Sequence, residues 1–377
     1  MKIFIVTSYA ESLVNFRLRL IKELIGRGVD VLVSAPGITI SQRNILETIG
    51  AKVYSVPLNR SGKNPFGDFI YLLRISSLFA VETPDIVFAY FLKPVAYAPI
   101  AARLSRVKRV VSMLEGMGSV FTYSNTESYK QKLFAIFVLK ILKIGVFFSD
   151  EIIVLNEFDK KTLIEERVVS ERSQLTCLGP IGVDLEKFVF TPPSSKKPIR
   201  FLFIGRLLKE KGIIELLESM KLLEDKGINA KLEIVGSVDP DKPSSLSQKD
   251  IDYYNKIRGV RFLGYVENVV PQIQKCHVVV LPSYREGYPV CVQEAMAVGR
   301  PVILSDSTGC YEVVSSSGAA IKAETFSVQD LAEKMIWASK NLTKLAEMGL
   351  AARLFAELNF DSQKINSKLA DKITYDF

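Results

Sequence analysis

The sequence predicts an α/β protein made of two doubly wound, Rossmann-like parallel sheets. Through the first half, short apolar strands alternate with helical segments, a pattern typical of sheets whose crossovers are helices. A linker rich in proline and serine, residues 191–198, then interrupts the pattern before strands and helices alternate again. A chain of 377 residues is long enough for two cores. We therefore expect one domain at 1–180 and a second at 181–359, with residues 360–377 crossing back onto the first.

The individual elements follow from apolar runs and from the glycines and prolines that bound them. In the first half the expected strands are Lys2–Val6, Val29–Ser34, Lys52–Val56, Ile86–Ala89, Arg109–Met113 and Glu151–Leu155, and the expected helices are Leu13–Ile25, Ile40–Ile49, Pro65–Val81, Pro94–Leu104 and Ser128–Phe148. In the second half the expected strands are Ile199–Ile204, Lys231–Val235, Gly259–Leu263, Val278–Leu281 and Pro301–Leu304, with helices at Gly212–Asp225 and from Pro289 to Gly299. Open parallel sheets bind ligands beyond the carboxyl ends of their strands, so two such sheets facing one another would form an interdomain cleft.

Composition excludes several classes of protein. Hydrophobic residues make up 48% and charged residues 24%, which is typical of globular proteins. No signal peptide and no charge-free apolar stretch of about 18 residues are visible, so a membrane-spanning helix is not expected. The widely spaced cysteines indicate buried thiols in a reducing cytosol rather than disulfides or a zinc site. They are Cys177, Cys276, Cys291 and Cys310.

The net charge of +8 is unevenly distributed. Residues 1–180 hold 23 basic and 16 acidic side chains, whereas residues 181–377 hold 26 and 25. Basic surfaces attract nucleic acid, anionic membranes or phosphorylated substrates. No nucleic-acid motif accompanies the charge, so we expect no nucleic-acid partner and favour the other two. The apolar segment Leu133–Phe148 is either a helix packed on the sheet, which we prefer, or a membrane-surface helix, an alternative that its flanking lysines keep open.

The stretch from Ser283 to Val314 carries the clearest functional pattern. It begins with a loop that we expect to be exposed, Ser283–Pro289, and continues into a helix. The first N–H groups of a helix have no partner within it and carry partial positive charge, which suits a phosphate. Glu286 and Glu294 flank that position, as a ligand with hydroxyls on both sides of a diphosphate would require. A nucleotide-sugar has this shape, although two solvated carboxylates at a helix start would give the same spacing.

A basic loop follows the first strand of the second half. Gly205 permits a tight turn at the strand end, where a ligand can approach the backbone. Arg206 offers a planar pair of donors and Lys211 a mobile charge, so together they suit two phosphates. The alternative is a basic loop with no ligand.

Together these segments resemble the retaining glycosyltransferases of family 4, which have the GT-B fold. That family carries a G-R-x4-K-G loop and an E-G-x-P…E-A element, here Gly205–Gly212 and Glu286–Ala295. Further motifs resemble the branch that builds capsule, O-antigen or N-glycan-type oligosaccharides on polyprenyl diphosphate. They are Ile181–Phe188 between the domains and, in the first half, Ser12–Arg17, Lys93–Pro94 and Gly116–Thr122.

The resemblance implies a retaining transfer of a hexose or N-acetylhexosamine from a UDP-sugar to a polyprenyl diphosphate-linked saccharide in surface polysaccharide synthesis. Arg206 and Lys211 would bind the donor diphosphate and stabilise it as the leaving group. Glu294 would accept hydrogen bonds from the ribose, and Glu286 would contact the donor sugar beside its anomeric carbon. The UDP-sugar is a co-substrate, and no cofactor is expected. Gly287, Tyr288 and Pro289 would shape the loop under the sugar and the phosphate.

Other residues are assigned from their positions. Strand ends place Gly236, Gly264, Tyr265 and Val266 near a base pocket. Asp239-Pro240-Asp241 has the pattern that holds a divalent metal in another transferase fold, but its loop composition suits a surface turn, and we expect no metal.

Two acid–base candidates are weighed in the same way. The only histidine, His277, is interpreted as structural. In the first half Glu115 is a candidate for acceptor binding or for a base, unless it is a loop carboxylate without a partner.

The charge distribution and the lipid-linked acceptor together favour a cytoplasmic enzyme attached peripherally to the anionic cytoplasmic face of the inner membrane. Two alternatives remain. A nucleotide-sugar 2-epimerase of the same fold would need acid–base groups in both domains, which the histidine-free first half and the spacing of Glu286 and Glu294 argue against. A sensor of nucleotide-sugars, without catalysis, is the other. A panel of UDP-sugars with and without the lipid-linked acceptor separates the three.

Overall fold

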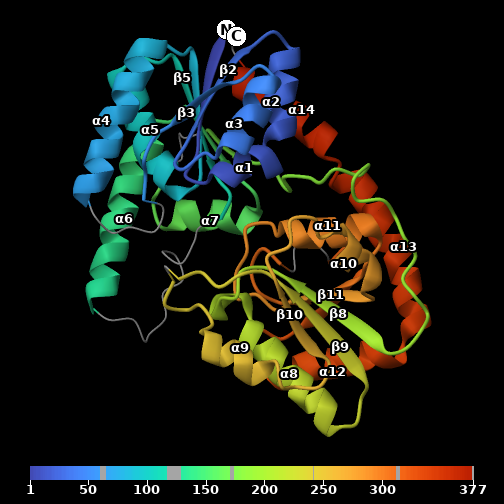
Figure 1. Ribbon diagram of the computed structural model, residues 1–377. Coiled ribbons are helices and arrows are strands. Elements are labelled where there is room, and N and C mark those ends of the chain that lie inside the picture. The colour runs from blue at the N-terminus through green and yellow to red at the C-terminus, as the bar shows by residue number, and fades with distance from the viewer. Residues whose placement is uncertain (60–64, 117–128, 170–173, 241, 311–314, 376–377) are drawn as a thin grey trace. The chain divides into compact units, whose positions relative to one another are not determined.

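The structure is a computed structural model that describes residues 1–59, 65–116, 129–169, 174–240, 242–310 and 315–375. It divides into two compact units, the first formed by Met1–Ile181 and Gln363–Phe377 and the second by Gly182–Ser362. Each unit contains its own parallel sheet (Figure 1). The second unit is therefore one continuous segment, whereas the first is assembled from two segments.

The sheet of the first unit has the strand order β3-β2-β1-β4-β5-β6-β7, and every pair is parallel. The order reverses its direction between β1 and β4, which is the switch point where doubly wound sheets bind ligands. The chain visits β1 to β3 on one side of this point and β4 to β7 on the other. The strands are β1 (Lys2–Val6), β2 (Asp30–Ala35), β3 (Lys52–Ser55), β4 (Ile86–Tyr90), β5 (Arg109–Leu114), β6 (Glu151–Val154) and β7 (Gln174–Cys177).

Helices cover both faces of this sheet. On one face a single buried cluster joins the strands to α4 (Pro65–Glu82), α5 (Leu92–Leu104), α6 (Tyr129–Phe147) and α7 (Glu157–Glu165). Figure 1 shows α4, α5 and α6 side by side, away from α1, α2 and α3. The remaining helices are α1 (Ala10–Asn15), α2 (Leu18–Gly26), α3 (Ile40–Thr48) and α14 (Ser362–Thr374).

The expected helix Leu13–Ile25 is wrong, because the chain forms α1 and α2 with a break at Phe16 and Arg17. Arg17 is fully buried, and its guanidinium lies 5.1 Å from the centroid of the Tyr90 ring. The side chain also contacts the carboxylate of Glu115. An arginine is almost never buried without a partner, and the break turns Arg17 toward the partners that the ends of β4 and β5 supply.

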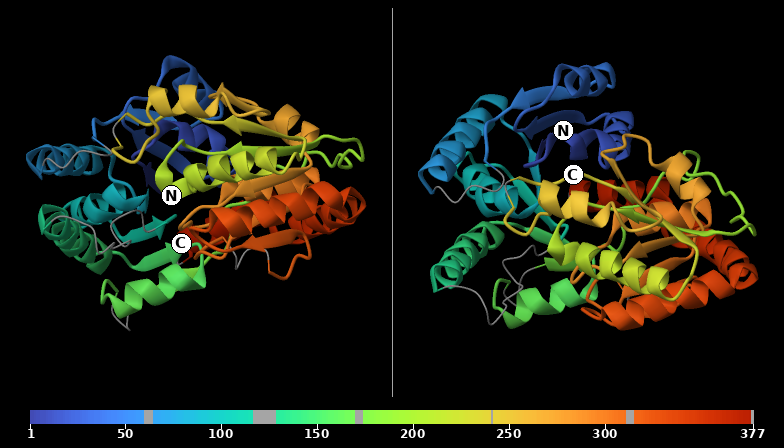
Figure 2. Two further views of the ribbon diagram at one scale, coloured as in Figure 1. Left: turned by 90° about the horizontal axis from the view of Figure 1, so that it is seen from below. Right: turned by 60° about the horizontal axis from the view of Figure 1, so that its bottom comes forward.

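The second unit has the strand order β10-β9-β8-β11-β12-β13, and all of its pairs are parallel. Two groups of helices lie on opposite sides of this sheet, α8 with α12 and α10 with α11 and α13 (Figure 2). The strands are β8 (Ile199–Ile204), β9 (Ala230–Val235), β10 (Val260–Gly264), β11 (Val278–Leu281), β12 (Val302–Ser305) and β13 (Ala320–Ala323). The helices are α8 (Ile213–Asp225), α9 (Gln248–Tyr254), α10 (Val270–Lys275), α11 (Val290–Val298), α12 (Val328–Lys340) and α13 (Leu342–Asn359).

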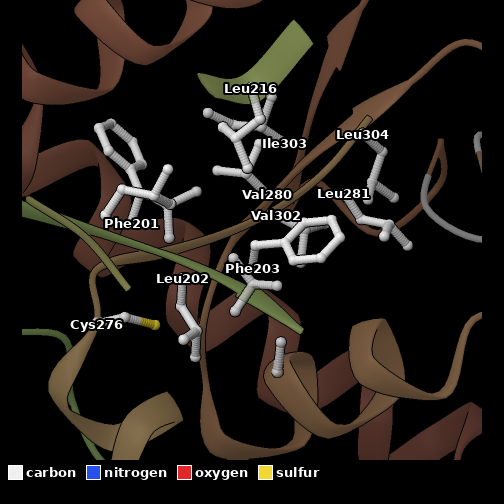
Figure 3. Close-up of a cluster of buried hydrophobic side chains, with 14 of the residues drawn as sticks. Phe201, Leu202, Phe203, Leu216, Cys276, Val280, Leu281, Val302, Ile303 and Leu304 are labelled. Carbon is white, nitrogen blue, oxygen red and sulfur yellow. The ribbon is translucent and has the colours of Figure 1, made fainter. Parts of the chain in front are cut away.

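The core of the second unit is built from the central strands β8, β11 and β12 (Figure 3). Phe203, Val280 and Ile303 are fully buried there, and Leu216 of α8 packs onto the same cluster. Strands that are covered on both faces are apolar throughout rather than alternating, which explains the continuous runs in the sequence. This core fixes the carboxyl ends of β8 and β11, from which the predicted site loops extend.

The last helix belongs to the first unit. Leu369, Ala370 and Ile373 of α14 are fully buried. An ion pair of 2.6 Å joins Asp371 to Arg27 of the α2 terminus. In the described part of the chain, no helix is long and apolar enough to cross a membrane.

Candidate functional site

Three of the predicted glycines lie in a row at the carboxyl edge of the second sheet. Gly205 follows β8, Gly236 follows β9 and Gly264 ends β10. The N–H of Gly236 donates to the Gly264 carbonyl at 2.8 Å, and the N–H of Gly205 donates to the Val235 carbonyl at 3.0 Å. A Cβ on Gly236 would lie 1.8 Å from the carbonyl oxygen of Gly205, and its φ is +145°. Only glycine fits there, so this edge offers backbone rather than side chains to a ligand.

The residues that follow β10 differ in exposure. The Tyr265 side chain is 71% exposed, whereas Val266 packs partly buried against the core of the second unit. An exposed aromatic ring beside a glycine-lined edge can stack on a planar base. The base-pocket assignment of these residues stays a prediction.

The two predicted motifs meet in an ion pair between Lys211 and Glu286. The ammonium nitrogen of Lys211 lies 2.5 Å from a carboxylate oxygen of Glu286, and the two side chains are 21% and 12% exposed. Lys211 ends a short 3-10 helix, Lys209–Lys211, and Glu286 lies in the loop after β11. Because the pair is half-buried, its charges are screened less by water than those of a surface pair.

Backbone contacts hold these two loops together. The N–H of Tyr284 donates to the Glu210 carbonyl at 2.9 Å, and the N–H of Glu286 donates to the Thr308 carbonyl at 3.0 Å. The loop Ser283–Pro289 is not the exposed loop that the sequence indicates, because Ser283, Gly287 and Pro289 are buried. The Ser283 hydroxyl donates to the Glu210 carbonyl at 3.1 Å, so the buried start of this loop is bonded to the neighbouring loop.

Arg206 has a partner that the sequence analysis does not assign to it. Its guanidinium lies 2.8 Å from the Asp239 carboxylate, and the arginine side chain is 45% exposed. Asp239 is the first residue of the Asp-x-Asp pattern, and Asp241 lies outside the described residues. Within the described ranges, no group of three or more His, Cys, Asp or Glu side chains could hold a metal ion. An exposed pair of this kind contributes little to stability, so a phosphate can compete with Asp239 for the arginine.

The N-terminus of α11 is the position at which the sequence predicts that an anion binds. Pro289 is the N-cap, and no side chain caps the helix. Among the described residues, no group accepts a hydrogen bond from the N–H of Val290, Cys291 or Val292. Tyr288 does not point into the open but packs its ring on Phe360, with centroids 5.9 Å apart. The loop is therefore fixed where unpaired N–H groups can bind an anion.

Glu294 lies in the second turn of α11 and is half-buried. Its carboxylate makes no hydrogen bond or ion pair with any residue in the described ranges. Burial raises the pKa of Glu294 to about 7, and the positive charge of Lys187 offsets part of that effect. A half-buried carboxylate without a partner is costly, which favours a ligand that donates hydrogen bonds to it.

In the first unit Glu115 is not a loop carboxylate without a partner. It contacts Arg17, and the side chain of Glu115 is 10% exposed. Two other guanidinium nitrogens of Arg17, Nε and Nη1, are buried without a hydrogen-bond partner. Glu115 therefore balances a buried cation at the carboxyl edge of the first sheet. The motif residues 117–122 that follow it lie outside the described residues.

His277 has the structural role that the sequence indicates. Its Nδ1 accepts a hydrogen bond from the Arg200 N–H at 3.0 Å, and Nε2 lies 3.1 Å from the Lys196 carbonyl. Burial lowers the pKa of this imidazole. With Nδ1 accepting and Nε2–H donating, the neutral ring joins Lys196 to the start of β8, both within the second unit.

Two family models match the chain. The model described as "Glycosyl transferase 4-like" matches residues 3–156, and the model described as "Glycosyl transferases group 1" matches residues 185–355. The second match contains the row of glycines, the Lys211–Glu286 pair and α11. The chain belongs to the group 1 glycosyltransferases.

Among its relatives, this glycosyltransferase is 28% identical over 351 residues to an enzyme of Campylobacter jejuni, covering 89% of this chain and 88% of that one. That relative is named N,N'-diacetylbacillosaminyl-diphospho-undecaprenol alpha-1,3-N-acetylgalactosaminyltransferase. A second relative, from Escherichia coli, is 28% identical over 257 residues, and the match covers 64% of this chain and 63% of that one. It is named UDP-Gal:alpha-D-GlcNAc-diphosphoundecaprenol alpha-1,3-galactosyltransferase.

The structure of this glycosyltransferase is similar to that of the sucrose-phosphate synthase of Thermosynechococcus elongatus. The TM-score is 0.81 at 17% identity, and the match covers 99% of this chain and 98% of that one. This likeness confirms the expected GT-B fold with two parallel-sheet α/β domains.

The sequence indicates the motifs of the site but not the residues with which the motif residues pair. The pairing of Arg206 with Asp239 joins two loops after neighbouring strands, and only their shared place after β8 and β9 could have indicated it. The burial of Arg17 left no signal in composition, because a single arginine in an apolar stretch is typical of a helix surface. In the sequence Lys93 is visible only as part of a motif, whereas in the structure it forms an ion pair with the buried Asp68.

Proposed function

We propose that this glycosyltransferase transfers a hexose or N-acetylhexosamine from a UDP-sugar to a polyprenyl diphosphate-linked saccharide, with retention, in surface polysaccharide synthesis. The observation that carries the proposal is the Lys211–Glu286 pair beside the N-terminus of α11, with Glu294 one turn into that helix. The second unit therefore contains the Lys211 cation, the unpaired N–H groups of α11 and the carboxylates of Glu286 and Glu294. That set matches a diphosphate with hydroxyl groups on either side.

In this proposal the chain stabilises the leaving group without a metal. As the bond from the sugar to the diphosphate breaks, negative charge develops on the departing UDP. Lys211, Arg206 and the N–H groups at the start of α11 are in place before the reaction, and such preorganised donors supply much of the stabilisation in an enzyme site. Glu286, held by Lys211, contacts the donor sugar, and Glu294 accepts hydrogen bonds from the ribose.

The acceptor assignment comes from the relatives. Both relatives described above act, by their names, on saccharides joined to undecaprenol through a diphosphate, and one uses UDP-Gal. We infer the same classes of donor and acceptor for this chain. The donor is a co-substrate, and the proposal includes no further cofactor, metal or nucleic acid.

A lipid-linked acceptor places the enzyme at a membrane surface, and α6 has a face that suits one. Phe137, Ile144 and Phe147 are 44%, 48% and 80% exposed and recur at helical spacing, with Lys140 exposed among them. Exposed apolar side chains together with lysines on the same helix are typical of interfacial helices. We propose peripheral attachment to the anionic, cytoplasmic face of the inner membrane through this face. The side chains of Lys130 and Lys132 lie outside the described residues.

A donor panel tests the proposal. The purified protein is incubated with UDP-glucose, UDP-galactose, UDP-N-acetylglucosamine or UDP-N-acetylgalactosamine, with and without a polyprenyl diphosphate-linked sugar, and the products are read by mass spectrometry. We expect the acceptor to gain one hexose or N-acetylhexosamine mass. Isomerisation of a free UDP-sugar without the acceptor would favour the 2-epimerase. UDP-sugar binding without any reaction would favour a sensor.

A further inference from the structure

A second site candidate lies in the first unit, in a pocket of about 540 Å³. Its walls come from the segments that follow β2 and β3, from the first turns of α4 and from the start of α5. This volume is within the range of small-molecule pockets. All the elements that form it belong to one unit, so the pocket does not depend on how the two units are placed.

A buried carboxylate lies in the wall of this pocket. Asp68 of α4 is 9% exposed and accepts two hydrogen bonds. One comes from the Lys93 ammonium at 2.7 Å and the other from the Tyr97 hydroxyl at 3.0 Å. Lys93 also lines the pocket, and its side chain is 18% exposed. The wall therefore presents acceptor oxygens and donor hydrogens side by side, held by partners on α5.

The rest of the lining is largely apolar. Pro36, Pro57, Leu58 and Ile70 contribute ring and aliphatic carbon to the walls. Arg74 also lines the pocket, is exposed, and makes no hydrogen bond or ion pair with any residue in the described ranges. A pocket with apolar walls and a few convergent polar groups is typical of a small-molecule site.

The chemistry of the lining selects among small ligands. A sugar ring has hydroxyl groups that both donate and accept, together with a carbon face that packs on apolar walls. An ion pair of a carboxylate and an ammonium matches vicinal hydroxyls, since one group accepts while the other donates. A diphosphate fits less well, because its charge would approach the buried Asp68 carboxylate.

We propose that this pocket binds a saccharide residue of the acceptor, with its hydroxyls on Asp68 and Lys93 and its ring against the proline and leucine walls. That a saccharide binds follows from the pocket itself; that this saccharide belongs to the acceptor rests on the proposed function. The site is separate from the row of glycines and the Lys211–Glu286 pair of the second unit. Lys93 and Asp68 determine in this way which acceptor sugar the enzyme selects.

Saturation-transfer NMR on the whole protein tests the pocket directly. The probes are the methyl glycosides of glucose, galactose, N-acetylglucosamine and N-acetylgalactosamine, with inorganic pyrophosphate as the anionic comparison. We expect at least one glycoside to receive saturation and the signal to fall at least fivefold in Lys93→Met. Lys108→Met is the matched control, because Lys108 also pairs with an aspartate of the first unit, Asp85 at 3.0 Å, but does not line the pocket.

A second variant shows whether a signal lost in Lys93→Met reflects the pocket or misfolding of that variant. Asn59→Trp places a large ring at an exposed position of the pocket wall without changing the Asp68–Lys93 pair, and it should also abolish the glycoside signal. No glycoside signal in the parent protein, or a signal that survives both pocket variants, overturns the proposal. Pyrophosphate binding that depends on Lys93, without glycoside binding, overturns it in favour of an anion site. No donor is present, so a failure here counts against the pocket, whereas failed transfer with intact glycoside binding counts against the proposed function.

Discussion

The ammonium group of Lys211 lies 2.5 Å from the carboxylate of Glu286, although the two residues are 75 positions apart. One follows β8 and the other follows β11, which are neighbouring strands, so their carboxyl ends bring the two loops together. In the proposed function, Lys211 and Glu286 contact different parts of one ligand, the diphosphate and the donor sugar. Its consequences can be measured residue by residue.

Removal of a phosphate-binding cation should lower turnover strongly. Lys211→Ala and Arg206→Ala should each reduce turnover by about two orders of magnitude, because each removes a donor that stabilises the departing diphosphate. Lys209→Ala is the control, since Lys209 is exposed in the same loop. We expect EDTA to change little. Strict dependence on a divalent metal would contradict this assignment and favour Asp239 and Asp241 as metal ligands.

The two glutamates should separate binding from transfer. Glu294→Ala should weaken UDP binding in calorimetry, because the ribose loses its acceptor. Glu286→Ala should bind UDP nearly as the parent protein does, yet transfer sugar poorly. The ribose assignment fails if both variants bind UDP like the parent protein.

UDP affinity should rise between about pH 6 and pH 8. The pKa of Glu294 is raised to about 7, so at pH 6 the carboxyl is mostly protonated in the unliganded protein. The ionised form accepts hydrogen bonds from ribose hydroxyls more strongly, so ionisation favours binding. Glu294→Gln removes this contribution and leaves the titration of the UDP phosphate, which lies near pH 6. Identical pH profiles of the two proteins would show that Glu294 does not contact the ligand.

Two glycines of the same edge should differ in what they tolerate. Gly236→Ala should destabilise the protein by about 3 kcal/mol or more, because its Cβ meets the Gly205 carbonyl and its φ is positive. Gly264→Ala should cost only about 1–2 kcal/mol, since its φ of +71° is strained but no atom lies within 4 Å of the added carbon. Urea unfolding of both variants measures the difference. Equal losses would mean that the close approach of the two strand ends is not as described.

Membrane attachment should depend on lysines of α6. Lys140→Gln and Lys143→Gln should each weaken sedimentation with anionic vesicles about fivefold, which corresponds to roughly 1 kcal/mol per lysine. Binding should also fall as salt rises through the physiological range. Lys226→Gln with Lys344→Gln in the second unit is the matched control. Equal binding to neutral vesicles, or no binding to either kind, would refute electrostatic attachment.

The sequence predicts the repeating architecture because buried strands and their crossovers leave a local signal. The edge strands β7 and β13 were not predicted, since each has four residues and is only partly buried, so neither forms an apolar run. The break at Arg17 was missed because its cause, Glu115, lies 98 positions away. The same limit applies to the site. Gly205, Arg206 and Glu286 are visible as motifs, whereas the Asp239 and Asp68 pairs depend on contacts between loops that only the fold creates.

The return of the chain to the first unit makes the core of that unit depend on the last helix to be synthesised. Domains generally fold as units, and N-terminal ones do so first during synthesis. Here α14 supplies buried residues and the Arg27–Asp371 pair to the unit that begins the chain. The second unit, which is continuous, contains every residue of its own core. The unit that is made first keeps part of its apolar surface uncovered until α14 packs onto it.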